Sequence, residues 1–143
     1  MSNYKFADHR LVHANGEPVD YVRSPNQSKK TITPKGIVLH YTCGYSHKGS
    51  VSWFKQRKAK AAAHFVVGRQ GQVTQQVDTN KKAWHAGPSR YKGLHGLNDH
   101  YIGIEQANIG WAWPQGDKFI DYYGKTIEAD GTVRNKKGRK TFK

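Results

Sequence analysis

The chain has 143 residues, of which 36% are hydrophobic and 24% charged, and its formal net charge is +14. This length accommodates one domain with a hydrophobic core, and a single cysteine, Cys43, excludes an intrachain disulfide framework. No stretch approaches the ~18 consecutive apolar residues that a membrane-spanning helix needs. The positive charge favours a polyanionic partner about as strongly as it favours solubility alone, and nucleic acid, anionic lipid and cell-wall polymers all qualify.

The first third of the chain predicts a buried strand after a polar, turn-rich segment. Residues 1–35 contain loop-forming Ser-Pro-Asn and Thr-Pro-Lys-Gly sequences. Residues 36–42 (GIVLHYT) form a short apolar run that is rich in residues favouring strands. We therefore expect a central strand here, with His40 near its carboxyl end.

The next segment predicts a short helix. Ser50 or Ser52 is expected to cap it, and Lys60 lies near its end. Val51 and Phe54 would face the core, with Trp53 as a further candidate, while the lysines would face solvent.

Residues 62–69 and 72–77 then read as two strands joined by a Gln-Gly turn, which is typical of a hairpin. Residues 78–100 follow as one long loop, and loops of this length in compact domains are usually functional. Residues 101–106 (YIGIEQ) predict a fourth strand.

Beyond Asn108 the apolar pattern weakens, with a short strand or turn expected around residues 118–120. We therefore predict one domain over residues 1–125 and a basic, flexible tail over residues 126–143. The tail is either a patch for polyanions or a solvated chain end.

Two side chains at predicted strand ends are candidates for catalysis. His40 is either a hydrogen-bonded core histidine or a zinc ligand through a neutral ring nitrogen. Glu105 is either a salt-bridged residue at the rim of the sheet or a general base whose pKa is raised by partial burial. Neither alternative is decided by the residue alone.

Several neighbouring residues are candidates for a substrate groove. His64 lies within an apolar strand and His85 in a Trp-His-Ala-Gly turn, so each either binds a ligand or is structural, with the structural role favoured for His64. Trp84 offers an apolar wall and an indole donor. Asn98 and the adjacent aspartate form either a polar rim or a simple turn. Cys43 is interpreted as a packed free thiol, and the remaining histidines as surface residues, namely His9, His13, His47, His95 and His100.

Taken together, these motifs resemble those of the type 2 N-acetylmuramoyl-L-alanine amidases. These zinc amidases include cytoplasmic anhydromuropeptide amidases, phage endolysins and peptidoglycan recognition proteins. The resemblance covers about residues 8–125, and the order and spacing of its short motifs make it specific. The motifs are Ser24-Pro25-Asn26, Ile37-Val38-Leu39-His40-Tyr41-Thr42, Lys58-Ala59-Lys60-Ala61-Ala62-Ala63-His64-Phe65, Gly68-Arg69-Gln70-Gly71, Ala83-Trp84-His85-Ala86-Gly87, Gly96-Leu97-Asn98-Asp99 and Ile102-Gly103-Ile104-Glu105.

The resemblance implies an α/β fold, a mixed β-sheet flanked by helices, that hydrolyses the amide between N-acetylmuramic acid and L-alanine in peptidoglycan or muropeptides. In the family scheme His40 matches the first ligand of a Zn²⁺ cofactor, and Glu105 matches the acid that deprotonates the attacking water. The substrate-binding residues would be Trp84, His85, Ala86, Gly87 and Asn98, with His64 as a further candidate.

The chain departs from the family after residue 106. The second zinc histidine, a third ligand (Asp or Cys) and a lysine that stabilises the oxyanion follow a long helix in the family, and residues 106–143 contain no match for them. The chain therefore looks C-terminally truncated, and an apolar face of the sheet would be exposed.

Two functions follow from this departure. The first is an amidase polypeptide that needs a complementing C-terminal fragment, with the activity of the isolated chain left open. The alternative is a non-catalytic peptidoglycan-binding module. Specific nucleic-acid binding is not expected, because no recognition motif is present. The polar start lacks the apolar core of a signal peptide. We therefore expect synthesis in the cytoplasm, with action there or at the wall after lysis or another export route.

Overall fold

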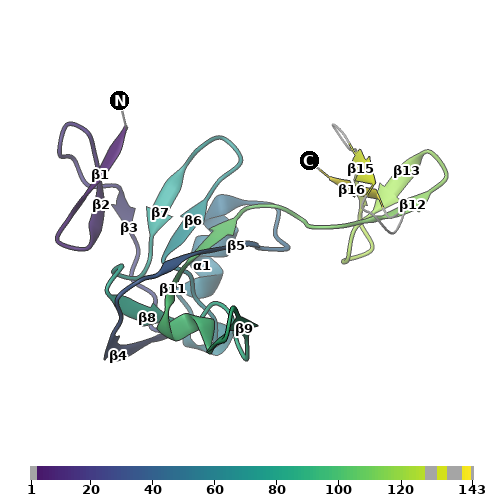
Figure 1. The fold of residues 1–143 in the computed structure, drawn as a ribbon. Helices are drawn as coiled ribbons and strands as arrows, with labels where there is room; N and C mark the ends of the chain where they lie inside the picture. The colour runs from purple at the N-terminus through teal and green to yellow at the C-terminus, as the bar shows by residue number, and fades with distance from the viewer. Residues whose placement is uncertain (1–2, 128–131, 135–139, 143) are drawn as a thin grey trace.

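The computed structural model describes residues 3–127, 132–134 and 140–142 (Figure 1). Its helices are short, and strands make up most of the regular structure. The helices are α1 (His47–Phe54) and the 3-10 helices η1 (Arg57–Ala59) and η2 (Leu97–Asp99). The strands are β1 (Tyr4–Ala7), β2 (Arg10–His13), β3 (Asp20–Tyr21), β4 (Gln27–Thr31), β5 (Gly36–Tyr41), β6 (Phe65–Val67), β7 (Val73–Gln75), β8 (Lys81–Ala83), β9 (Arg90–Tyr91), β10 (Leu94–His95), β11 (Tyr101–Gln106), β12 (Trp113–Gln115), β13 (Lys118–Ile120), β14 (Thr126–Ile127), β15 (Thr132–Arg134) and β16 (Lys140–Phe142).

A five-stranded mixed sheet with the order β3-β7-β6-β11-β5 forms the centre of the molecule. Strands β5, β11 and β6 run parallel to one another, while β7 is antiparallel to β6. The carboxyl ends of the three parallel strands therefore meet at one edge of the sheet, where α/β folds place their ligands. The predicted strands at 36–42 and 101–106 and the predicted hairpin at 62–77 are confirmed, and the fold class is the expected one.

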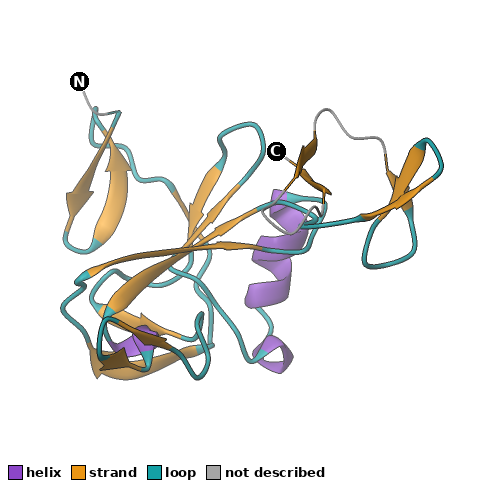
Figure 2. Ribbon diagram, turned by 45° about the vertical axis from the view of Figure 1, so that its right-hand side comes forward, coloured by secondary structure: helices purple, strands orange, loops and turns teal. Residues whose placement is uncertain are grey.

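Helix α1 covers one face of the sheet (Figure 2). Val51 and Phe54 are buried against Val66 of β6, as their spacing predicts. The predicted start of the helix was wrong. Its N-cap is Ser46, whose side chain accepts a hydrogen bond from the backbone N–H of Gly49 at 3.0 Å. Ser50 and Ser52, the predicted caps, lie inside the helix, because the capping position is taken by Ser46.

The Ser24-Pro25-Asn26 motif holds the end of α1 in place. The amide of the fully buried Asn26 donates to the carbonyl oxygens of Gln56 and Ala61, at 2.9 and 3.0 Å. The hydroxyl of Ser24, also fully buried, donates to the carbonyl of Phe54 at 2.6 Å. The carbonyls at a helix end have no partners within the helix, so this motif satisfies them from outside.

The opposite face of β5 is apolar and open to solvent. Ile37, Leu39 and Tyr41 alternate along the strand and are 59%, 64% and 51% exposed. Their partners on β11 include Ile102 and Ile104, which point to the same face. The exposed apolar face expected from the sequence is therefore present.

The predicted loop over residues 78–100 contains short ordered elements, namely β8, β9, β10 and η2. Strand β8 pairs with β4, so part of the segment before residue 36 is also built into a sheet. Sequence periodicity does not detect strands of two or three residues.

After β11 an extended segment leads to a separate three-stranded sheet, β12-β13-β14, which lies apart from the central sheet (Figures 1 and 2). The predicted strand at 118–120 is confirmed as β13. The domain boundary at 125/126 stays a prediction, and ten residues of the predicted tail (128–131, 135–139 and 143) lie outside the described residues. No helix in the described part of the chain is long and apolar enough to cross a membrane.

Candidate active site

His40 and Glu105 lie side by side at the carboxyl edge of the sheet. They are paired in the parallel register of β5 and β11, so their side chains point to the same face. The alternation of side chains along β5 places Ile37, Leu39 and Tyr41 on the opposite face from His40.

Glu105 is a partly buried acid with an unsatisfied oxygen. Its Oε2 atom is inaccessible to solvent and has no hydrogen-bond partner among the described residues. Burial raises the pKa of Glu105 to about 7, because the charged carboxylate loses hydration that nothing replaces. A carboxyl group with this pKa accepts and releases a proton near neutral pH, as a general base requires.

His40 is hydrogen-bonded to His85, with 3.0 Å between Nε2 of His40 and Nδ1 of His85. The other ring nitrogen of His85, Nε2, lies 3.0 Å from the carbonyl oxygen of Tyr101. A carbonyl only accepts, so Nε2 of His85 carries the proton and Nδ1 accepts. His40 must then donate through Nε2, which leaves its Nδ1 as the free lone pair.

His64 is fully buried behind this pair, and both of its ring nitrogens are engaged in hydrogen bonds. Nε2 lies 2.8 Å from the carbonyl of Lys81, and Nδ1 accepts from the backbone N–H of Gly103 at 3.0 Å. Burial lowers the pKa of both His64 and His85 to about 4, so both rings are neutral. This geometry favours the structural role for His64 over the contact with substrate that was also considered.

The glycine of the Ile-Gly-Ile-Glu sequence, Gly103, leaves room for the ring of His85. A Cβ atom at this position would overlap the ring of His85 and would lie 2.7 Å from its Cβ. Any larger side chain would therefore push His85 away from His40.

The Trp-His-Ala-Gly turn is held by Asn98. Its Oδ1 atom accepts hydrogen bonds from the backbone N–H groups of His85 and Ala86, at 3.0 and 2.7 Å. Trp84 is 37% exposed, and Gly87 is exposed with a φ of 52° that favours glycine. The structure therefore brings the predicted groove residues together, with Asn98 shaping the turn and Trp84 presenting an open indole surface.

The remaining histidines and the cysteine do not join this site. His9, His13 and His95 are exposed. His47, expected at the surface, lies in α1 and is only partly exposed, and its Nε2 atom is buried without a partner among the described residues. Cys43 is a free thiol whose pKa is raised by burial and by the charge of Glu105.

Comparison with known proteins agrees with this fold. A family model described as N-acetylmuramoyl-L-alanine amidase matches residues 29–132. The chain belongs to this family, which confirms the resemblance found in the motifs. Two solved structures, PlyL and the catalytic domain of XlyA, share the fold, with TM-scores of 0.52 and 0.50 and identities of 19% and 24%. The chain aligns over 74% of its length with 64% of PlyL, and over 63% with 63% of XlyA.

Among curated proteins, the 1,6-anhydro-N-acetylmuramyl-L-alanine amidase AmpD of Escherichia coli is 46% identical over 46 residues, which are 32% of this chain and 25% of AmpD. The N-acetylmuramoyl-L-alanine amidase AmiD of the same organism is 29% identical over 117 residues, 77% of this chain and 41% of AmiD. The chain thus spans a quarter to two fifths of the length of these relatives.

Proposed function

We propose that this chain is a peptidoglycan amidase polypeptide that hydrolyses the amide between N-acetylmuramic acid and L-alanine. The observation that carries the proposal is the pairing of Glu105 with His40 at the carboxyl edge of the sheet, in a chain of the amidase family. The partly buried carboxylate of Glu105 has the pKa that proton transfer at neutral pH requires.

In the proposed reaction, the carboxylate of Glu105 takes a proton from water. The water oxygen forms a bond to the lactyl carbonyl carbon, and the carbon–nitrogen bond to L-alanine then breaks. The proton held by Glu105 passes to the leaving nitrogen, which regenerates the carboxylate. Trp84 and the turn that follows it would form the substrate-facing wall beside this step.

Zinc dependence is a further part of the proposal, with His40 as one ligand through its free Nδ1. Catalytic zinc sites have three protein ligands and one open position. The described residues contain no group of three or more His, Cys, Asp or Glu side chains arranged to hold a metal, so they do not fit the ion by themselves. When complete, such a site would supply Lewis-acid polarisation of the carbonyl.

We infer that a complementing fragment supplies the remaining ligands and covers the apolar face formed by Ile37, Leu39 and Tyr41. Exposed apolar surfaces of this kind are typical of interaction sites. Access to the cell wall, through lysis or another export route, belongs to the same proposal.

The test is co-expression with a fragment that carries a histidine and an Asp or Cys on a helix. Zinc bound per chain should rise from near zero to near one, and peptides should be released from peptidoglycan. His40→Ala should abolish zinc binding, while Glu105→Gln should retain zinc and lose hydrolysis. If zinc never exceeds the level of the His40→Ala variant, the metal part of the proposal fails.

The alternative is a non-catalytic peptidoglycan-binding module, and the incomplete metal-ligand set favours it. The net charge of +14 would attract the anionic polymers of a cell wall. A pull-down with insoluble peptidoglycan across a salt series separates the two functions. Retention without peptide release, under all zinc and fragment conditions, would establish the binding module.

A further inference from the structure

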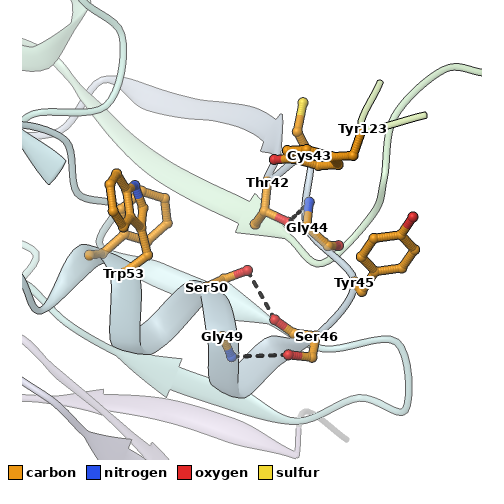
Figure 3. A pocket seen from close by; sticks show the side chains of 10 residues that line it. Thr42, Cys43, Gly44, Tyr45, Ser46, Gly49, Ser50, Trp53 and Tyr123 are labelled. Atoms are coloured by element: carbon orange, nitrogen blue, oxygen red, sulfur yellow. Dashed lines mark hydrogen bonds between the residues drawn. The ribbon is translucent and has the colours of Figure 1, made fainter. Parts of the chain in front are cut away.

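A pocket of about 470 Å³ opens just beyond the carboxyl end of β5 (Figure 3). Its lining combines aromatic rings with hydroxyl groups. The rings belong to Tyr45, Trp53 and Tyr123, and the hydroxyls to Thr42, Ser46 and Ser50.

The pocket adjoins the strand ends that carry the candidate active site, although neither His40 nor Glu105 lines it. Thr42 follows His40 by two residues, and its backbone N–H donates to the carbonyl of Gln106 at 3.0 Å. Gln106 directly follows Glu105 on β11. Cys43 lines the pocket, and the charge of Glu105 contributes to the raised pKa of its thiol, so a ligand in the pocket would lie near the carboxylate that we propose as the base.

The three aromatic rings that line the pocket are largely exposed to solvent. Tyr45, Trp53 and Tyr123 are 42%, 47% and 66% exposed. Exposed apolar surface that faces a common hollow, with polar groups between, is typical of ligand sites. Lys125 lies at the rim, with its Nζ atom 4.6 Å from the centroid of the Tyr45 ring. The lining contains no acidic residue.

Tyr123 comes from the separate C-terminal sheet, on a turn that is well braced. The buried Asp121 accepts hydrogen bonds from the backbone N–H groups of Tyr123 and Lys125, at 2.9 and 2.8 Å. A third bond joins the backbone N–H of Asp121 to the carbonyl of Lys125 at 3.0 Å. These hydrogen bonds fix the backbone of the turn, and the ring of Tyr123 packs edge-on against that of Tyr122, with 5.5 Å between the ring centroids.

We propose that this pocket binds a sugar ring of the peptidoglycan glycan, with Tyr123 as its outer wall. An N-acetylated pyranose has an apolar C–H face that stacks on aromatic rings and an edge of hydroxyl and amide groups that bonds to hydroxyl side chains. The positive charge of Lys125 suits the lactyl carboxylate that hydrolysis leaves on a muramic unit, because that group is a neutral amide before cleavage. The inference rests on the proposed function, because the amide cleaved beside Glu105 is attached to such a sugar.

The test is calorimetric titration with a tetramer of N-acetylglucosamine. This sugar carries no stem peptide and no lactyl–alanine amide, so binding is measured without hydrolysis. Tyr123→Ala should weaken binding at least about tenfold, a loss of about 1.4 kcal/mol. Tyr123→Phe keeps the ring and should bind within about twofold of the parent. Tyr91→Ala removes a ring that is 51% exposed and does not line the pocket, and should also bind like the parent.

The indole N–H resonance of Trp53 should shift during the titration. Failure of the parent chain to bind the tetramer at millimolar concentration would overturn the inference, as would equal binding by Tyr123→Ala. A shift of Trp53 with the free stem peptide or with single-stranded DNA, but not with the sugar, would assign the pocket to those ligands instead. Hydrolysis is measured separately, so sugar binding without peptide release would contradict the proposed activity and leave the pocket assignment standing.

Discussion

His40 and His85 form a hydrogen-bonded pair in which His40 donates from Nε2 and His85 accepts at Nδ1, over 3.0 Å. The direction of this bond is set by the other nitrogen of His85, Nε2. This nitrogen donates its proton to the carbonyl of Tyr101, so Nδ1 of His85 can only accept. His85 therefore orients His40, in the way that hydrogen-bonded groups behind a metal ligand orient it in other proteins.

The hydrogen-bond pattern predicts the tautomers of three histidines. In the metal-free chain at pH 6, His40, His64 and His85 should all carry their proton on Nε2. His64 and His85 should stay neutral, because burial lowers the pKa of each to about 4. Nitrogen-15 correlation spectra of the imidazole rings report the tautomer directly. Protonation on Nδ1 of His85 would reverse the direction of the bond and refute the orienting role.

Glu105→Gln should stabilise the metal-free chain at alkaline pH. The pKa of Glu105 is raised from 4.5 to about 7 by burial, so its neutral form is favoured by folding. That contribution is complete below pH 4.5 and is lost as the pH rises through 7. Such a shift corresponds to at most about 3 kcal/mol, and partial exposure reduces the expected gain at pH 8 to about 1–2 kcal/mol.

Urea unfolding of both proteins in chelator, at pH 4.5 and pH 8, measures this difference. The two proteins should have about the same stability at the lower pH, where Glu105 is neutral. A variant that is less stable than the parent at pH 8 would show that the carboxylate has a favourable partner. The same substitution should abolish any amidase activity, since glutamine cannot take the proton.

Gly103→Ala should displace His85 and disturb His40 without removing either residue. The added methyl group would overlap the His85 ring, and overpacking of this kind typically costs about 1–3 kcal/mol. The resonances of His40 should shift, and zinc binding in the complemented protein should weaken. Gly71→Ala is the matched control. It has a φ of +82° and open space around it, so it should cost about 1 kcal/mol and leave the histidine resonances unchanged. Unchanged His40 resonances in Gly103→Ala would contradict the proposed coupling.

Much of the central sheet could be predicted from the sequence, because its strands carry strong local patterns. The apolar residues before His40 and the Ile-Gly-Ile sequence before Glu105 predict that both residues lie at strand ends. The register that sets them side by side could not be predicted, since pairing of β5 with β11 depends on contacts more than 60 residues apart. The same limitation applies to His85, whose role as a partner of His40 depends on that register.

The aromatic pocket could not be found from the sequence for a similar reason. Tyr45 and Trp53 lie close together along the chain, and a helix beginning near residue 47 would have placed both near the end of β5. Tyr123 comes from a separate sheet some 70 residues later, and no pattern in the sequence connects it to them. The role of Asn26 is likewise invisible in the sequence, where the Ser-Pro-Asn motif reads only as a loop.

Asn26→Asp should be one of the most destabilising single-atom changes in this chain. The Nδ2 group of Asn26 donates to three carbonyl oxygens, those of Phe54, Gln56 and Ala61, at 3.3, 2.9 and 3.0 Å. Aspartate replaces this donor with an acceptor, so a buried oxygen would face carbonyl oxygens with no proton between them. The loss of buried hydrogen bonds and the desolvation of the acid should together cost about 3 kcal/mol or more.

Asn15→Asp is the control, because the exposed Asn15 uses only its oxygen, as acceptor for the N–H of Glu17, and aspartate preserves that bond. Thermal unfolding should show a large drop in melting temperature for Asn26→Asp and almost none for Asn15→Asp. Equal effects of the two substitutions would mean that the Ser-Pro-Asn motif does not brace the end of α1.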